Sequence, residues 1–179
     1  MDVRKLFCAA VMVVCVSFAV NAQISPNAIG LRGVLVSKPS SGFEVNYQRA
    51  VSDKNRLEFG ALWDNSSYER YDTKFFGGFA GYHRHYNVKG GFNSYLGPGA
   101  YAGYQSLSYD TDYYSGSKSD KTYFGIGGQM GIEYNFNVFR VPLLLSFDLR
   151  MFLETLPLFK GECFFCVVSD FSLGIRYTF

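Results

Sequence analysis

Apolar and polar side chains alternate without a break along residues 168–179, the last part of the chain. One face would carry Phe171, Leu173, Ile175, Tyr177 and Phe179, and the other Ser172, Gly174, Arg176 and Thr178. Successive side chains of a β-strand point to opposite faces, so this pattern predicts a strand with hydrocarbon on one side and a polar interior on the other.

The same alternation recurs in seven earlier segments. They cover roughly residues 28–36, 42–50, 57–63, 75–86, 93–104, 122–134 and 143–153. Lipid offers no partner for a backbone N–H or C=O group, so the last strand must pair with the first. We therefore expect an all-β fold, an eight-stranded antiparallel up-and-down transmembrane β-barrel, and we expect it to be monomeric.

Two of these strands carry ambiguities. In the fourth, Phe76 and Tyr82 lie on one parity, and His83 and His85 lie on the other. We favour the parity that places Phe76 and Tyr82 toward lipid. In the fifth, Pro98 cannot donate to a ladder, so we expect a bulge or a local break there.

The connections between the predicted strands are of two kinds. Residues 52–55, 87–91 and 135–141 form short turns, whereas residues 37–41, 64–74, 106–121 and 155–167 form longer or more polar loops. Outer-membrane barrels have short periplasmic turns and long extracellular loops. With this alternation, both termini are expected in the periplasm.

The N-terminal segment has the features of a secretory signal. Arg4 and Lys5 precede an apolar run over residues 6–18, and Val20-Asn21-Ala22 suits a signal peptidase. We expect residues 1–22 to be cleaved and residues 23–179 to form the barrel domain. The apolar run is shorter than the roughly 20 residues that a membrane-spanning helix needs.

Composition narrows the function classes. The formal charge of +2 falls by one without residues 1–22, which argues against a nucleic-acid binder. An aromatic content of 18% and 19 glycines suit a barrel with aromatic girdles. Nothing in the composition indicates a cofactor.

Charged residues occupy the polar parity of several predicted strands. An eight-stranded barrel has an interior that side chains can fill, and charges confined there are expected to pair. We predict a structural lumen network, rather than a solute path or a ligand site, of Arg32, Glu44, Glu58, Glu133, Asp148, Arg150 and Arg176.

The chain resembles the small outer-membrane barrels of the OmpX, OmpW and OmpA-transmembrane type, and more closely those common in Bacteroidetes. The resemblance covers the mature chain and is carried by the signal sequence, residues 95–101 and 146–150, and the aromatic C-terminus. It implies that Tyr177 and Phe179 belong to a signal read by the barrel-assembly machinery. Members of such families serve as adhesins, ligand carriers or enzymes.

Two enzyme families share this scaffold, a lipid A deacylase and a lipid A palmitoyltransferase. The only histidines, His83 and His85, lack a His-x-Ser-Asn sequence around them and lie near the predicted periplasmic end. His-x-His could bind a metal from one strand face, but no third ligand is near in sequence. We expect neither a catalytic nor a metal site.

The predicted outer loops contain two further features. Cys163 and Cys166 lie in an oxidising compartment, which favours a local disulfide over redox or zinc chemistry. Tyrosines among small polar residues could contact a partner, although an aromatic belt has the same composition. They are Tyr68, Tyr71, Tyr109, Tyr113 and Tyr114.

The sequence thus predicts an outer-membrane barrel with a structural or surface-interaction role through its outer loops. Its expected contacts are outer-membrane lipid, the assembly machinery and an unidentified extracellular ligand. Two alternatives stay open, a lipid A-modifying enzyme and a narrow small-solute porin.

Overall fold

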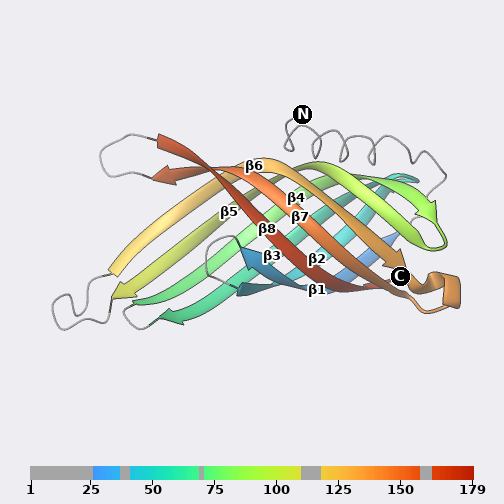
Figure 1. Ribbon diagram of the computed structural model, residues 1–179, viewed down its shortest axis with the longest axis horizontal. Coiled ribbons are helices and arrows are strands. Elements are labelled where there is room, and N and C mark those ends of the chain that lie inside the picture. The colour runs from blue at the N-terminus through green and yellow to red at the C-terminus, as the bar shows by residue number, and fades with distance from the viewer. Residues whose placement is uncertain (1–25, 37–40, 69–70, 110–117, 158–162) are drawn as a thin grey trace, which may run out of the picture.

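The computed structural model describes residues 26–36, 41–68, 71–109, 118–157 and 163–179, and these form a closed ring of antiparallel strands in sequence order (Figure 1). The strands are β1 (Asn27–Val36), β2 (Ser41–Ser52), β3 (Asn55–Tyr68), β4 (Tyr71–Lys89), β5 (Phe92–Tyr109), β6 (Lys118–Asn135), β7 (Leu143–Pro157) and β8 (Cys163–Thr178). The predicted eight-stranded up-and-down barrel is confirmed. The predicted signal peptide lies outside the described residues.

Closure is made by the first and last strands. β8 pairs with β1 from Ala28 opposite Thr178 to Val36 opposite Asp170. At the terminal end of this ladder, Asn27 and Phe179 exchange two backbone hydrogen bonds of 3.0 Å. Within the ring each strand therefore has a neighbour on both sides, as a sheet in hydrocarbon requires.

The outer and inner faces of the ring have opposite chemistry. On β8, Leu173 and Ile175 are 59% and 50% exposed, whereas Ser172 and Arg176 are buried. A water-soluble protein would place these residues the other way round. The exposed apolar residues include Trp63, Phe76, Phe124, Phe147 and Phe171, and they form a belt around the barrel.

The fourth strand has the favoured parity. Phe76 and Tyr82 are exposed on the outside of β4, while Phe79, His83 and His85 are buried in the lumen.

Pro98 lies at a local break of one ladder. Between β4 and β5 the pairing runs to Gly81 opposite Gly99 and resumes, in the same register, at Arg84 opposite Leu96. Pairing with β6 continues through Pro98 opposite Gly128. The break is thus confined to the β4 side and involves no register shift.

Turns at the end that holds both described chain ends are short. Ser52 pairs directly with Asn55, and Gly90 and Gly91 have φ angles of 61° and 92° that suit glycine. Between β6 and β7, a 3-10 helix η1 (Phe136–Phe139) begins after Asn135, whose side chain accepts a hydrogen bond from the backbone N–H of Asn137. We refer to this end as the turn end. No helix among the described residues is long and apolar enough to cross a membrane.

The opposite end differs from the prediction. The segments predicted as long loops are largely strand, because β3 and β4 continue to Tyr68 and Tyr71, β5 and β6 to Tyr109 and Lys118, and β7 and β8 to Pro157 and Cys163. An antiparallel pair satisfies its backbone groups whatever its side chains are, so these hairpins extend past the last alternating residue.

The rim at this end is uneven, as Figure 1 shows. The β1–β2 hairpin stops at Leu35 opposite Ser41, and β2 leaves β3 after Phe43 opposite Trp63. On the other side, β6 and β7 part after Phe124 opposite Thr155. A four-stranded extension remains, which we call the outer sheet; it comprises residues 64–68, 71–75, 105–109 and 118–123.

Candidate functional site

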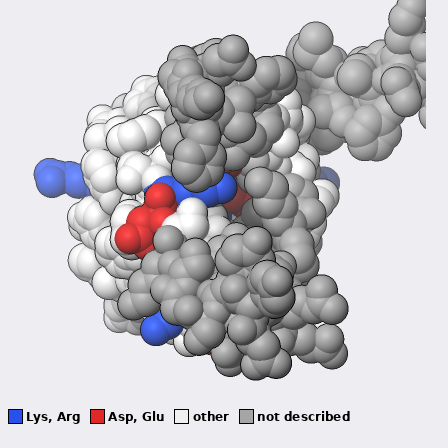
Figure 2. Space-filling model, turned by 90° about the vertical axis from the view of Figure 1, so that its left-hand side faces the viewer, with Lys and Arg blue, Asp and Glu red and all other residues white. Residues whose placement is uncertain are grey.

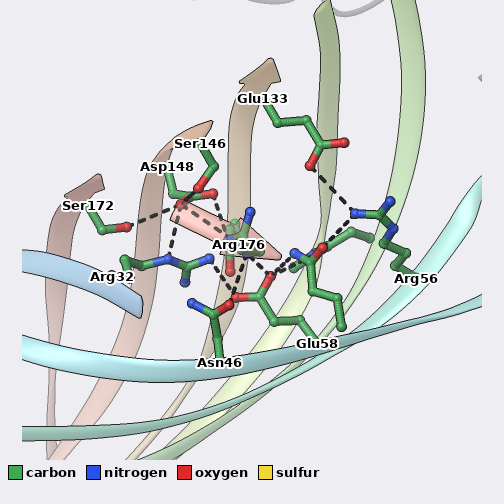
Figure 3. Close-up of polar contacts among 12 residues, drawn as sticks. Arg32, Asn46, Arg56, Glu58, Glu133, Ser146, Asp148, Ser172 and Arg176 are labelled. Atoms are coloured by element: carbon green, nitrogen blue, oxygen red, sulfur yellow. Dashed lines mark hydrogen bonds and ion pairs between the residues drawn. The ribbon is translucent and has the colours of Figure 1, made fainter. Parts of the chain in front are cut away.

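Arg32 is the centre of a buried ion cluster in the lumen (Figure 3). Its guanidinium lies 2.9 Å from Glu44, 2.7 Å from Glu58 and 3.1 Å from Asp148. The side chains of all four residues are fully buried. β1, β2, β3 and β7 each supply one residue, so a single cation ties four strands together across the interior.

Asp148 and Arg176 extend this cluster. Asp148 accepts hydrogen bonds from Ser146 at 3.2 Å and Ser172 at 3.4 Å, and one from Gln129 at 3.1 Å. Arg176 donates to Asn46 at 2.9 Å and lies 3.8 Å from Asp148. Neutral donors thus share the solvation of the buried carboxylate with the two arginines.

Toward the outer sheet the cluster continues through Arg150. This guanidinium pairs with Glu44 at 2.7 Å and with Asp170 at 2.9 Å. It also lies 5.0 Å from the centre of the Phe79 ring. Arg150 therefore connects the ionic layer to an aromatic one.

The aromatic layer fills the lumen beyond Arg150. Phe152 packs edge-on against Phe79 at 6.0 Å and against Tyr101 at 4.9 Å between ring centres. The Tyr101 hydroxyl donates to Glu154 at 2.5 Å. These rings occupy interior space that water would fill in an open channel.

Toward the turn end, the two histidines face carboxylates. His83 Nδ1 is 3.6 Å from Glu58, and His85 Nδ1 is 3.5 Å from Glu133. The Tyr95 ring lies 5.3 Å from the His83 ring and 5.0 Å from the His85 ring. All of these side chains are buried, so they pack the lumen and face no solvent.

Every residue of the predicted lumen network lies in the interior and contacts an opposite charge. Glu133 pairs with Arg56 at 3.6 Å, and Arg56 is linked to Glu58 through Gln48. Arg56 and Asp170 were not predicted in the lumen, although they share the inward parity of Glu58 and Ser172. Phe152 and Leu144 are inward apolar residues that were not predicted either, although they share the parity of Arg150 and Ser146.

Neither histidine is open to a substrate. His83 and His85 are 0% and 1% exposed, and both lie in the lumen. Among the described residues, no group of three or more His, Cys, Asp or Glu side chains could hold a metal ion. The described lumen side chains link the strands to one another through ion pairs, hydrogen bonds and ring contacts.

The cysteine prediction needs correction. Cys163 and Cys166 lie in β8, opposite Pro157 and Glu154, and not in a loop. Residues three apart in a strand are separated by about 10 Å, and a disulfide needs Cα atoms within roughly 7 Å. This backbone does not permit the expected local disulfide.

The structure describes three of the five tyrosine residues that were predicted to contact a partner. Tyr68 pairs with Tyr71, and Tyr71 pairs with Tyr109, so three of them meet at the far end of the outer sheet and not in loops. Tyr113 and Tyr114 lie outside the described residues. Tyr177 and Phe179, the expected assembly signal, are half exposed on the belt, with their rings 6.2 Å apart.

The edges of the outer sheet are a second candidate site. Residues 64–68 of β3 and 118–122 of β6 each pair with one neighbour and have no strand partner on the other side within the described ranges. The described part of this end of the barrel carries both basic and acidic side chains (Figure 2).

Solved structures similar to this chain are small outer-membrane β-barrels. The attachment invasion locus protein Ail of Yersinia pestis matches with a TM-score of 0.54 and 16% identity over 87% of this chain and 97% of Ail. Neisserial surface protein A matches with a TM-score of 0.54 and 16% identity over 86% of this chain and 96% of that protein. The N-terminal β-barrel domain of OprF from Pseudomonas aeruginosa matches with a TM-score of 0.55 and 13% identity over 87% of this chain and 100% of that domain.

The chain therefore has the fold of the eight-stranded outer-membrane β-barrels. No protein-family model matches it, and no curated protein is similar to it in sequence.

Proposed function

We propose that this chain is an integral outer-membrane barrel without an open pore, and that it binds extended polypeptide segments through the edges of its outer sheet. The observation that carries the proposal is that residues 64–68 of β3 and 118–122 of β6, which continue past the closed ring, pair with one neighbouring strand each within the described residues. One of the fold neighbours, Ail, is named an attachment invasion protein, so this fold supports a surface-interaction role.

An unpaired strand edge presents a row of backbone donors and acceptors. An added strand can pair with such a row, and its alternate side chains give specificity. The edge of β6 reads Lys-Ser-Asp-Lys-Thr over residues 118–122, and its charges oppose uncontrolled edge-to-edge association. A partner with an extended segment would supply the missing neighbour.

The membrane orientation is part of the proposal. The turn end, with its short connections, would face the periplasm, and the outer sheet would face the exterior. An epitope inserted in the Gly90–Gly91 turn should be inaccessible to antibody on intact cells. Folding of the barrel should show as a shift between unheated and heated samples on a gel.

A solute-conducting role is opposed by the filled lumen. The Arg32 cluster and the Phe79–Phe152 layer occupy successive levels of the interior. We expect almost no conductance in a planar bilayer, and steady channels in the wild-type protein would revive the porin alternative.

A lipid A-modifying role is opposed by the position of the histidines. Both are buried at the turn-end half of the lumen, where no lipid can reach them. Mass spectrometry of lipid A from cells with and without the protein should give the same spectrum. A change of one acyl chain would contradict the proposal.

Binding can be tested with peptides selected from a random library on the full chain in lipid nanodiscs. Bound peptides should protect amides within residues 118–122 or 64–68 from hydrogen exchange. Two sets of peptide variants should be compared, one methylated at the odd-numbered backbone nitrogens and one at the even-numbered ones. The set whose N–H groups face the barrel edge should lose binding, and the other set should keep it. Equal effects in both sets would show that the peptide is held by its side chains and not by strand pairing.

A further inference from the structure

Basic side chains gather outside the lumen at the turn end. Arg49, Arg84, Lys89 and Arg140 are exposed there, and Lys54 is half-buried in the β2–β3 turn. Among the described residues at this end that lie outside the lumen, Asp53 is the one acidic residue. The outward face of this end is therefore strongly basic.

Three of these residues, Arg49, Lys54 and Arg84, lie on adjoining elements, and we call them the basic cluster. Arg49 is opposite Leu57 on β3, which in turn is opposite Tyr82 on β4, two positions from Arg84. Usual strand spacing and rise put the Cα atoms of Arg49 and Arg84 about 12 Å apart. Two arginine side chains can span that distance. Lys54 lies in the β2–β3 turn next to this row, and its carbonyl accepts a hydrogen bond from the backbone N–H of His85 at 2.7 Å.

The outward residues around the cluster mark a membrane–water boundary. On β4, Phe76 and Ala80 are followed by Tyr82, Arg84 and Tyr86 on the same face. The Arg84 guanidinium lies 5.8 Å from the centre of the Tyr86 ring. Tyrosine and arginine that follow an apolar stretch are typical of the level of lipid headgroups.

The charges of the cluster are available for a ligand. None of the three residues forms an ion pair with another described residue. At the other end of β4, Lys74 is also exposed, two positions from Asp72 on the same face. Guanidinium groups present forked donors that match phosphate oxygens, and an ammonium adds a point charge.

We propose that Arg49, Lys54 and Arg84 bind the phosphate of an anionic phospholipid in the leaflet at the turn end. The site fixes the depth of the barrel in that leaflet and enriches anionic lipid around β2–β4. This inference shares only the membrane span with the function proposed above; peptide binding at the outer sheet can fail without affecting it.

The test uses the full chain in nanodiscs of phosphatidylcholine that contain spin-labelled phosphatidylglycerol or spin-labelled phosphatidylcholine. Electron spin resonance then gives the relative affinity of the protein for the two lipids. We expect at least a roughly fivefold preference for phosphatidylglycerol, because one basic residue near an anionic lipid surface already contributes about that factor. Inorganic phosphate should not remove it, because the lipid is held by its chains as well.

Charge-removing variants locate the site. Arg84→Gln and Arg49→Gln should each lower the preference, and the triple variant with Lys54→Gln should abolish it. Lys74→Gln, which removes one outward charge from the other end of β4, is the matched control and should change nothing. A gel-shift assay verifies folding of each variant.

Three results would overturn the proposal: no lipid preference in the wild-type protein, a preference that survives the triple variant, or equal losses in Arg84→Gln and Lys74→Gln. Competition by inorganic phosphate would point to a soluble anion as the ligand instead.

Discussion

Strands β3 to β6 run through two regions of the molecule, the belt and the outer sheet, which differ in whether the strand edges are paired. In the belt each strand pairs on both sides, and the ring closes between Ala28 and Thr178. In the outer sheet β3 and β6 keep only one neighbour each within the described residues. Hydrocarbon cannot hydrogen-bond to a bare edge, whereas water can. The same strands can therefore be closed at one level and open at another.

The side chains of the two regions differ in the same way. Belt residues alternate between exposed apolar and buried polar, as Ile175 and Arg176 do. Residues 64–67 of the outer sheet are Asp-Asn-Ser-Ser, polar on both faces. Strand pairing on both sides and alternation of apolar and polar side chains occur in the same region because the surrounding lipid requires both.

The largest loss of stability is expected on removal of Arg32, the central cation of the lumen inside the belt. Arg32→Met would leave Glu44, Glu58 and Asp148 buried without their main counter-charge, which we expect to cost about 3–5 kcal/mol of unfolding free energy. Urea unfolding in lipid vesicles, followed by the fluorescence of Trp63, measures it.

The matched control is Lys74→Met in the outer sheet, which should stay within about 0.5 kcal/mol of the wild-type protein. If both variants were equally stable, the ion cluster would not hold the belt together.

A smaller effect is expected where β4 and β5 approach at the Pro98 break. A Cβ atom added at Gly97 would lie 1.8 Å from the Tyr82 carbonyl oxygen, so the backbone must shift. Gly97→Ala should destabilise the barrel by about 1–3 kcal/mol, the usual cost of overpacking.

Gly78→Ala is the control for Gly97→Ala, because its Cβ would have 3.9 Å to the nearest atom, the Gly60 carbonyl oxygen. The same urea unfolding assay should find Gly78→Ala close to neutral. Comparable losses in the two variants would count against the close approach.

The smallest effect on the stability of the whole barrel is expected from substitutions at the edge of β6. Neighbouring residues of an antiparallel strand direct their N–H groups to opposite sides, so one of Lys121 and Thr122 donates toward β5 and the other toward the open edge. Proline is tolerated only where the N–H faces away from the ladder. Of Lys121→Pro and Thr122→Pro, one should disrupt the outer sheet, and the other should leave it folded but lose peptide binding.

Circular dichroism and peptide affinity, measured on both proline variants in nanodiscs, separate these effects. If both variants disrupted the sheet equally, the edge would be paired on both sides.

The belt could be predicted from the sequence because lipid on one side and a lumen on the other impose a two-residue period. The fourth strand shows the limit of this reasoning, since aromatic residues occupy both parities and only burial separates Phe76 from Phe79. Phe152 was not predicted in the lumen, because a small interior needs filling by volume as well as by polarity.

The outer sheet was predicted as loops because its residues lack alternation, although backbone pairing needs none. For the same reason Cys163 and Cys166 were placed in a loop, and an extended backbone there excludes the bridge that a turn could have allowed. The lumen network was easier to predict, since charges with no exit from a narrow barrel must pair, as Arg32 and Glu44 do across β1 and β2.

Hydrogen exchange on the nanodisc-embedded protein tests the central claim most directly. We expect amides of residues 124–134 in β6 to be protected throughout, and those of residues 118–122 to alternate between protected and rapidly exchanging. Uniform protection of residues 118–122 would mean that the edge is already covered, and that result would contradict an open edge available to a partner strand.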